Sequence, residues 1–481
     1  MPKIVILWTD VVVLLLVAAL GLYVWQVRRS ADLRATWRRV FQDAPAMGAS
    51  VVLLTALGIT LLDSLHFRPL LPAAPGTSAV AYDTRTWSVL DLGLSRLVAG
   101  REATYSEPLA CEGFTKESLE VNGQAQRLRP RLQHACPGLA EPATQRGADI
   151  VGRIGFGLLG GGALAVLLSA ALVAVLARRS TAGFGVTAAE VWQGRTALPW
   201  RAFLAVLALL CLAGGVAASL SQAYHVLGTD RTGNDVLYQC LKSIRTAFVI
   251  GTLSTIATLP LAVGLGIAAG YLRGWVDEVV QYLYTMLSSV PNVLLIAACV
   301  LMVQVFLDKN PDLFETGAER ADLKLFLLCA ILGLTGWAGL CRLLRAETMK
   351  LRELEYVQAA TAFGVSDLRI MVRHIFPNVA HLMLITTVLD FCALVLYEAV
   401  LSYVGVGVDP SMNSFGGMIN VARTEMSRDP LVWWSFASAF GFMVTLVLAA
   451  NLFADGVQNA FDPRARIFRP RLSVLPRRKV A

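Results

Sequence analysis

The chain has 481 residues, of which 56% are hydrophobic and only 16% are charged, and this composition excludes an ordinary soluble protein. Several apolar runs reach the ~20 residues that a helix needs to cross a bilayer. The formal net charge of +8 does not indicate nucleic-acid binding, because the basic residues gather at the ends of those runs. The sequence therefore predicts an all-α polytopic membrane protein.

Residues 1–65 contain two predicted membrane spans, 4–27 and 47–65. A basic loop joins them, with arginines at Arg28, Arg29, Arg34, Arg38 and Arg39. Because positively charged loops stay on the cytoplasmic side, the N-terminus is predicted to lie outside. The first run is too long, and too strongly flanked by later positive charge, for a cleaved signal peptide.

Residues 66–149 form a mixed, charged segment that we expect to be a small external domain. Of the eight cysteines in the chain, six lie in or beside predicted spans, whereas Cys111 and Cys136 lie in this segment. If the segment is outside the cytoplasm, the two can form a disulfide. The alternative is a pair of free thiols.

Residues 150–200 hold a third span, 150–176, and a cytoplasmic linker. The span contains GFGLLG, with Gly155, Gly157 and Gly160 at the spacing of a dinucleotide-binding fingerprint. No strand precedes it and it lies within an apolar helix, so the fingerprint lacks its structural context. Small residues in such a helix indicate close packing against another helix instead.

Residues 201–463 hold six more predicted spans, at 201–220, 248–271, 279–306, 323–344, 379–404 and 432–453. Pro260 and Pro291 are expected to kink their spans. The acidic segment 308–322 fits the outside, and residues 464–481 form a basic tail that fits the cytoplasm. Only the turn at 271–278 fits its predicted cytoplasmic side poorly, since it carries Asp277 and Glu278 against Arg273.

The most informative stretch is the loop 351–378, a basic, helix-patterned insert between two apolar runs. Its apolar residues recur at helical spacing on both sides of Gly364, which predicts two short helices with a bend between them. Ser366 is expected to begin the second helix, and Pro377 marks its exit toward the next span. The loop is predicted to be an amphipathic elbow on the cytoplasmic face.

Another polar stretch, 225–235, leads into the fifth span. Its acidic residues suggest a calcium loop, but with Asp230 counted as position one, position twelve is Leu241, where a bidentate glutamate is needed. A metal site is therefore not expected. In the eighth span Asp390 and Glu398 lie about two turns apart, so both can face a translocation path, or they can make an interhelical hydrogen bond with no role in transport.

The sequence EYVQAATAFGVSDLRIMVRHIFPN resembles the conserved cytoplasmic loop of ABC-importer permeases of the dipeptide, oligopeptide and nickel subfamily. The resemblance runs from residue 201 onward and includes an outer segment at Gly228, Thr229, Asp230, Gly233 and Asp235. Glu398 lies in YEAVLSYVGVG, which is similar to another stretch of the family. The candidate ATPase-coupling residues of the loop are Glu355, Tyr356, Ala359, Ala360, Gly364, Asp367, Arg373, Ile375 and Pro377.

This resemblance implies a type I importer permease core of six spans, preceded by three spans and an external domain that the usual family member lacks. It further implies a second permease, two cytoplasmic ATPase subunits, an external solute-binding protein and a peptide cargo, in a bacterial inner membrane with the C-terminus cytoplasmic. The chain has no Gly-Lys-Ser or Gly-Lys-Thr P-loop. ATP and Mg²⁺ are therefore expected in the partner ATPases, with no cofactor bound by this chain.

Two alternatives of other classes stay open at this point. An ion-driven secondary transporter would place paired charges at broken helices near the middle of the membrane and would need no docking loop. A membrane scaffold or receptor with an inactive permease core would use the extension to bind a partner. The sequence assigns no function to residues 1–200.

Overall fold

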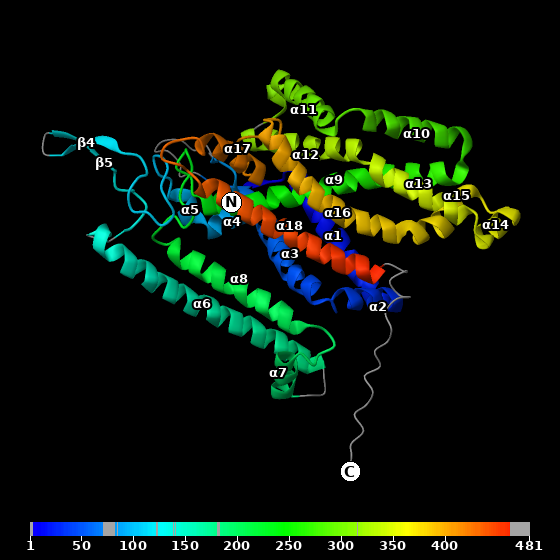
Figure 1. Cartoon of the computed structure of the whole chain (residues 1–481), viewed down its shortest axis with the longest axis horizontal. Helices are drawn as coiled ribbons and strands as arrows, with labels where there is room; N and C mark the ends of the chain where they lie inside the picture. Colours follow the sequence, from blue (N-terminus) through cyan, green and yellow to red (C-terminus); the bar gives the residue numbers. More distant parts are fainter. Residues whose placement is uncertain are drawn as a thin grey trace, which may run out of the picture.

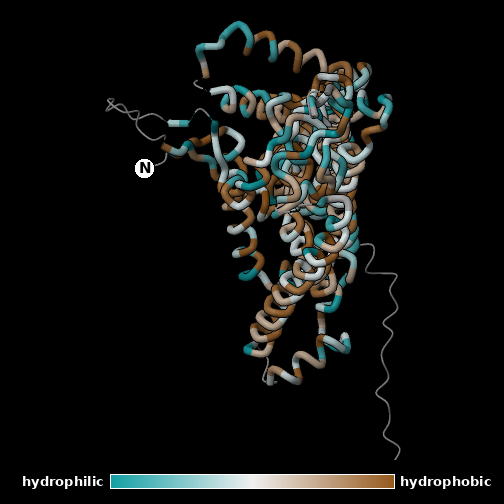
Figure 2. Tube along the Cα trace, turned by 90° about the vertical axis from the view of Figure 1, so that its left-hand side faces the viewer, coloured by the Kyte–Doolittle hydropathy of each residue, from teal (hydrophilic) through white to brown (hydrophobic). Residues whose placement is uncertain are grey.

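The computed structural model describes residues 3–70, 82–83, 85–121, 124–137, 139, 141–179, 183–314 and 316–461. Within these ranges nine helices are long and apolar enough to cross a membrane, which confirms the predicted number of spans. Figure 2 shows hydrophobic residues, in brown, along much of the helical part of the chain. The basic tail predicted at 464–481 lies outside the described residues.

The N-terminal part contains α1 (Trp8–Arg29), α2 (Ala31–Val40) and α3 (Ala44–Asp63). The prediction that the first helix starts at Ile4 was wrong, because Lys3–Val5 forms β1 instead. This strand pairs with β2 (His66–Arg68), which also pairs with β3 (Trp87–Ser88). The small antiparallel sheet therefore joins the start of the chain to the segment that follows α3.

That segment, residues 66–141, is called the insert here. It contains α4 (Val89–Gly93), α5 (Ser95–Ala99) and a hairpin of β4 (Glu117–Val121) and β5 (Gln124–Leu128). Its buried apolar residues lie in clusters shared with the rest of the chain: Tyr105 and Phe114 pack with Trp434, and Leu97 packs with Leu237. The insert is therefore built onto the helical bundle and does not have a separate core.

The next helices form a limb that extends from the body at the bottom of Figures 1 and 2. They are α6 (Pro142–Arg179), α7 (Phe184–Gln193) and α8 (Trp200–Leu220). A Cβ added to Gly157 would lie 2.7 Å from the Gly215 carbonyl oxygen, and one on Gly161 would lie 2.4 Å from that of Cys211. The predicted close packing thus occurs at Gly157 and Gly161, whereas Gly155 and Gly160 have open space around them.

The fifth spanning helix is α9 (Val236–Leu272), which continues through Pro260. It is followed by α10 (Gly274–Ser289), α11 (Asn292–Lys309), the short helix η1 (Pro311–Leu313), α12 (Gly317–Gly336) and α13 (Ala338–Arg352). The prediction of one span over 279–306 was wrong, because two helices meet there. Val290 is extended, with ψ of 134°, as expected for a residue before proline, so Pro291 ends one helix and begins the next instead of kinking a single one.

The last part contains α14 (Glu355–Ala362), α15 (Asp367–Ile370), a π-helical turn η2 (Met371–Ile375), α16 (Phe376–Tyr403), α17 (Phe415–Glu425) and α18 (Trp434–Phe461). Figure 1 shows α14 and α15 at one end of the long axis and the β4–β5 hairpin at the other. We call these the loop end and the insert end. The helix α9 runs between them over roughly 55 Å at 1.5 Å per residue.

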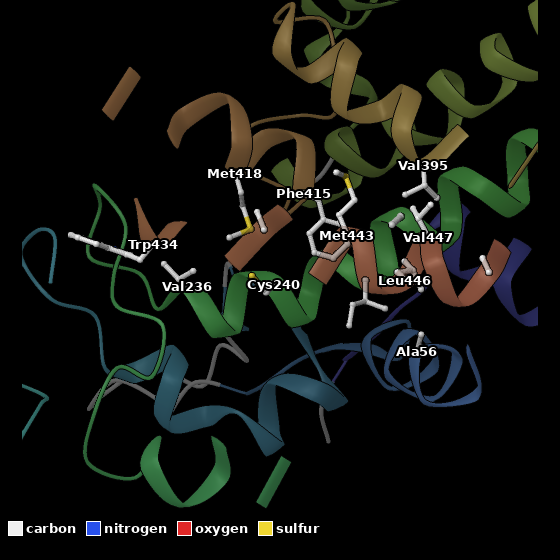
Figure 3. Packing of buried hydrophobic residues seen from close by; sticks show 14 of the residues in the cluster. Ala56, Val236, Cys240, Val395, Phe415, Met418, Trp434, Met443, Leu446 and Val447 are labelled. Carbon is white, nitrogen blue, oxygen red and sulfur yellow. The ribbon is translucent and has the colours of Figure 1, made fainter. Parts of the chain in front are cut away.

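The largest apolar cluster lies where α9 crosses α16, α17 and α18. Val236 and Cys240 of α9 face Phe415 and Met418 of α17 and Met443 of α18 (Figure 3). Ala56 of α3 belongs to the same cluster. The N-terminal extension therefore shares the core of the bundle.

Buried charges also join the extension to α9. The Lys242 ammonium lies 3.2 Å from Asp63 at the end of α3 and 3.0 Å from Asp91 of α4. Asp91 also accepts a hydrogen bond from Tyr238 at 2.9 Å. A buried cation requires such compensation, because desolvation of an unpaired charge costs several kcal/mol.

Candidate functional site

The elbow at the loop end is shaped by a helix cap at Gly364. The residue has φ of +73°, in the left-handed region that glycine adopts without strain. The N–H of Val365 donates to the Ala360 carbonyl at 3.1 Å and that of Gly364 to Thr361 at 3.0 Å. This pair of bonds is a Schellman motif, which ends α14 and turns the chain into α15.

Three apolar side chains anchor the elbow to the helical bundle. Val357 of α14, Ile370 of α15 and Ile375 of the π-helical turn are at most 1% exposed. They lie in one cluster with Tyr271 of α9 and with residues of α10 and α13, including Tyr284, Leu340 and Leu344. The elbow is therefore packed against the body and is not a freely hanging loop.

Polar contacts hold the same elements together. The Tyr271 hydroxyl donates to Asp367 at 3.1 Å, and Arg273 forms a 2.5 Å ion pair with Glu353. The Asn378 amide donates to the Tyr356 hydroxyl at 3.2 Å. Consequently the C-terminal end of α9 and the start of α16 both contact the elbow directly.

The acidic turn that fitted its predicted side poorly has an explanation here. The guanidinium of Arg345 on α13 donates to Asp277, with one N–O distance of 2.7 Å, and this hydrogen bond lowers the pKa of Asp277. The carboxylate is thus neutralised locally. It does not act as a free negative charge at the loop end.

On its outer side the elbow exposes a row of apolar side chains, which we call the loop surface. The exposed fractions are 87% for Phe363, 69% for Leu368, 59% for Val372 and 43% for Tyr356. Phe363 and Leu368 flank the Gly364 turn. Exposed apolar groups of this kind mark a site of contact with another protein or with a membrane.

The sequence-predicted loop residues divide into two groups. Glu355, Tyr356, Ala359, Gly364, Asp367, Arg373 and Pro377 are exposed and Ala360 is half-buried, whereas Ile375 is fully buried. Ile375 therefore anchors the elbow and cannot be touched by a partner in this arrangement. Ser366 does begin α15, but its side chain makes no capping hydrogen bond.

Sequence reasoning did not select Phe363, Leu368 or Val372. The only signal for them was an apolar residue beside a predicted glycine turn, and the helical pattern assigns such residues to a buried face by default. Their exposure depends on how the elbow packs on α9 and α13, which is tertiary information.

At the insert end, the predicted outer segment is held by the insert. Thr229 accepts a hydrogen bond from the Ser106 N–H at 2.7 Å and donates to the Thr104 carbonyl at 2.9 Å. Gly233 approaches Glu102 so closely that an added Cβ would lie 1.8 Å from the Glu102 carbonyl oxygen. Asp235 caps α9 by accepting from the Tyr238 N–H at 3.1 Å.

Two of the remaining outer-segment residues have local roles. Asp230 accepts hydrogen bonds from the backbone N–H groups of Thr232 and Asn234 at 2.8 and 2.9 Å, which closes a tight turn. Gly228, with φ of +74°, lies against the Ser106 carbonyl and the Trp434 ring.

His225 connects the outer segment to the insert through two carboxylates. Its Nδ1 lies 2.8 Å from Asp235, and its Nε2 lies 3.6 Å from Glu102. Burial alone would lower the pKa of His225, but the hydrogen bond to Asp235 and the negative charges of Asp235 and Glu102 outweigh burial and raise it to about 9. At neutral pH the His225 imidazolium therefore makes ionic interactions with Glu102 of the insert and with Asp235 at the start of α9.

The structure separates the two acidic residues of α16. Glu398 is 3% exposed, accepts from Ser402 at 2.7 Å, and accepts from the Gly416 N–H at 3.2 Å at the start of α17. It makes the interhelical hydrogen bond that was one of its two predicted roles. Asp390 is half-buried, and within the described part of the chain no hydrogen bond or ion pair engages it.

Residues 262–467 match the family of binding-protein-dependent transport system inner membrane components. The oligopeptide transport system permease protein OppC of Mycobacterium tuberculosis is 31% identical over 245 residues, which are 51% of this chain and 78% of that protein. The chain belongs to this family.

Other members align with a similar share of the chain. The glutathione transport system permease protein GsiD of Pectobacterium atrosepticum is 29% identical over 242 residues, covering 50% of this chain and 73% of its own length. The dipeptide transport system permease protein DppC of Lactococcus lactis is 28% identical over 243 residues, covering 50% and 64%. The chain is thus a multi-pass membrane permease component, and the matched region contains the elbow.

The family model does not include residues 1–261. The first three spans, the insert and most of α9 therefore lie outside it. A structure of the MetNI methionine ABC transporter in an inward-facing conformation overlaps 47% of the chain with a TM-score of 0.35 and 13% identity. At that score the likeness fixes no correspondence between individual helices.

Proposed function

We propose that the chain is a permease subunit of an ATP-driven importer of short peptides, and that its elbow binds a separate cytoplasmic ATPase subunit. The observation that carries the proposal is the loop surface, which displays Phe363 and Leu368 to solvent on an element fixed by Val357, Ile370 and Ile375. A short helix presented in this way fits a groove of a partner. Burying a side chain of this kind contributes roughly 1.5–3 kcal/mol.

The sequence indicates which subunits bind ATP. Because the chain lacks a P-loop, we assign ATP and Mg²⁺ to two partner ATPases. Alternating access then requires that the ATPases bind the two states of the permease with different affinity. The elbow is suited to transmit that bias because Tyr271 and Asp367 link it to α9 and because it continues directly into α16.

We infer the class of transported substrate from the names of the related proteins. Their names specify oligopeptides, glutathione and dipeptides, so we propose short peptides, delivered by an external solute-binding protein and carried between this chain and a second permease. Asp390 is the proposed path residue, because it is a half-buried carboxylate without a partner among the described residues. Glu398 is not, because its carboxylate is used by Ser402 and Gly416.

The proposed orientation places the loop end in the cytoplasm and the insert end outside. The arginines of α2 and of the loop 351–378 support it by the positive-inside rule. The disulfide between Cys111 and Cys136 in the insert also supports it, because such bonds persist in oxidising compartments.

The test is purification of the chain from its native membrane with identification of the accompanying subunits. The proposal predicts recovery of a second permease and of ATPases whose activity rises when a peptide-loaded binding protein is added. A chain that transports peptide into vesicles without any ATPase would contradict it.

A further inference from the structure

The part of the insert that projects farthest is the β4–β5 hairpin with its stem, residues 111–136, which we call the arm (Figure 1). Above the stem, Ser118 pairs with Arg127 in the antiparallel register. The pairing continues toward the base of the arm. There the Gly113 N–H donates to the Pro130 carbonyl at 2.7 Å, and the Leu132 N–H donates to the Cys111 carbonyl at 3.0 Å. A disulfide between Cys111 and Cys136 closes the base, with a Cα–Cα distance of 5.5 Å.

The base of the arm is hydrogen-bonded to residues 223–225, in the segment that leads into α9. The Cys136 N–H donates to the Ala223 carbonyl at 2.7 Å, and the Leu109 N–H donates to His225 at 2.9 Å. Both disulfide cysteines are buried in one cluster with Ala223 and Tyr224. Stem, disulfide and bundle therefore hold the arm in a defined direction.

The upper arm is solvated on both sides. Arg127 and Leu128 are neighbours in β5 and so point to opposite faces, yet both are exposed, with 42% for Leu128. A two-stranded hairpin that packs against nothing has little stability of its own in water. The disulfide-closed stem compensates for this, so the exposed hairpin is held in place with both of its faces available for contact.

The charges on the arm are uneven. The stretch 124–131 contains three arginines and no acidic residue. Arg131 is engaged, since it donates to the Leu139 carbonyl at 2.5 Å. Among the described residues no hydrogen bond or ion pair engages the side chains of Arg127 and Arg129, which are two residues apart in extended chain and so share one side. The register places Glu120 of β4 opposite Ala125 on the same side, so two arginines there face one glutamate. This side of the arm therefore keeps an excess of positive charge, which fits an acidic surface.

We propose that the arm is a docking element for the external solute-binding protein and that Arg127 and Arg129 contact an acidic patch on it. The inference rests on the proposed function. An ATPase is excluded by position, because the elbow lies at the opposite end of the molecule. We assign the bilayer and a second permease to the flanks of the spanning helices, and the arm extends beyond the ends of those helices (Figure 1). In a binding-protein-dependent system, the component that approaches from that direction is the binding protein.

The experiment uses the complete purified complex in lipid nanodiscs. Its probe is the external binding protein that stimulates the ATPase activity of the wild-type complex, titrated to find the concentration for half-maximal stimulation. One variant combines R127E with R129E, and a second replaces residues 116–129 by a short Gly-Ser turn while keeping both cysteines. Arg96→Glu is the matched control, because it is an exposed arginine of the insert outside the arm.

We expect the double reversal to raise the half-maximal concentration about tenfold, which is the size expected for removing and inverting two exposed charge contacts, and to make it less sensitive to salt. The shortened arm should raise it further, with unstimulated ATPase activity unchanged in all variants. Arg96→Glu should behave as wild type. A photo-crosslinker at position 127 should attach to the same binding protein.

An unchanged titration in both arm variants, or crosslinking to the second permease instead, would overturn the docking role while leaving the importer assignment intact. If no external binding protein stimulates the wild-type complex, the importer assignment itself fails, and this inference fails with it. The two failures are therefore distinguishable within one experiment.

Discussion

Arg245 of α9 lies 2.6 Å from Asp10 of α1, so the first spanning helix neutralises a buried cation in the core. The same guanidinium donates to the Thr9 hydroxyl at 2.8 Å and lies 3.8 Å from Asp322 of α12. The carboxylate of Asp10 also contacts His66 at 2.8 Å. The first span is thus electrostatically part of the bundle that contains α9 and α12.

Removing one partner of this pair should therefore destabilise the protein. Asp10→Ala leaves Arg245 with the more distant Asp322, and breaking a buried pair costs roughly 3–5 kcal/mol. The measurement is the thermal midpoint and the yield of detergent-purified protein. Arg320→Ala is the control, because Arg320 and Asp308 form an exposed pair, whose loss is worth about 1 kcal/mol or less. Equal behaviour of the two variants would contradict the assigned role of the buried pair.

Gly364→Val should impair coupling more than folding. A β-branched residue is strained at φ of +73° by an estimated 1–2 kcal/mol, which is enough to reshape the exposed elbow but not to unfold the bundle. The expected result is normal membrane insertion with a lower amount of peptide transported per ATP hydrolysed. Gly339→Ala is the control, since nothing lies within 4 Å of its added Cβ. Full transport by Gly364→Val would argue against a specific elbow geometry.

Phe363→Ser should weaken retention of the ATPases. The ring is 87% exposed, so its replacement costs the isolated chain little, but it removes roughly 1.5–3 kcal/mol of apolar burial in the proposed interface. We expect at least a tenfold loss of ATPase in pull-down from membranes at equal permease levels. Phe184→Ser serves as the control, because this phenylalanine is also exposed (51%) but lies on α7. Equal losses of bound ATPase in both variants would show that the loop surface is not a specific ATPase-binding site.

The contact between insert and bundle should weaken as pH rises. The pKa of His225 is raised from 6.5 to about 9, so its stabilisation is complete below pH 6.5 and is lost as the pH passes through 9. The difference corresponds to on the order of 3 kcal/mol. Thermal midpoints measured from pH 6 to pH 10 should fall, and His225→Gln should be less stable at pH 6 and show a flatter profile.

The groups that face His225 are Asp235 and Glu102, and His134 lies 3.7 Å from Glu102. Burial alone would raise the pKa of Glu102, but its hydrogen bonds, including those from the Gln133 and His134 N–H groups, outweigh burial and lower that pKa, so this carboxylate does not produce the slope. His381→Gln is the control, because His381 lies far along the chain on the exposed start of α16 and bonds to Asn378. A slope that survives in His225→Gln would assign the pH dependence to other groups.

Much of this architecture could be predicted from residue patterns alone. Span number follows from apolar length, and the elbow follows from helical spacing interrupted by Gly364. The break at Pro291 was predicted only as a kink, because local rules say that proline disturbs a helix but not whether neighbouring packing lets the helix continue. Pro260, which α9 accommodates, illustrates the other outcome.

The features that could not be predicted depend on long-range contacts. The insert was expected to form a small domain, but Tyr105 and Phe114 bury themselves against Trp434, more than 300 residues away. The pairing of Glu398 with the start of α17 likewise requires that two separate helices meet. The exposure of Phe363 and Leu368 also depends on how the elbow packs on α9 and α13.

In the proposed assembly this chain transports peptide only when its loop end is bound to ATPases. The most direct test is peptide uptake into vesicles that contain the purified complex, compared with vesicles that contain the chain alone, with and without ATP. We predict ATP-dependent uptake by the complex, no uptake by the chain alone, and loss of uptake in Phe363→Ser. Uptake by the chain alone, driven by an ion gradient and indifferent to ATP, would contradict the claim.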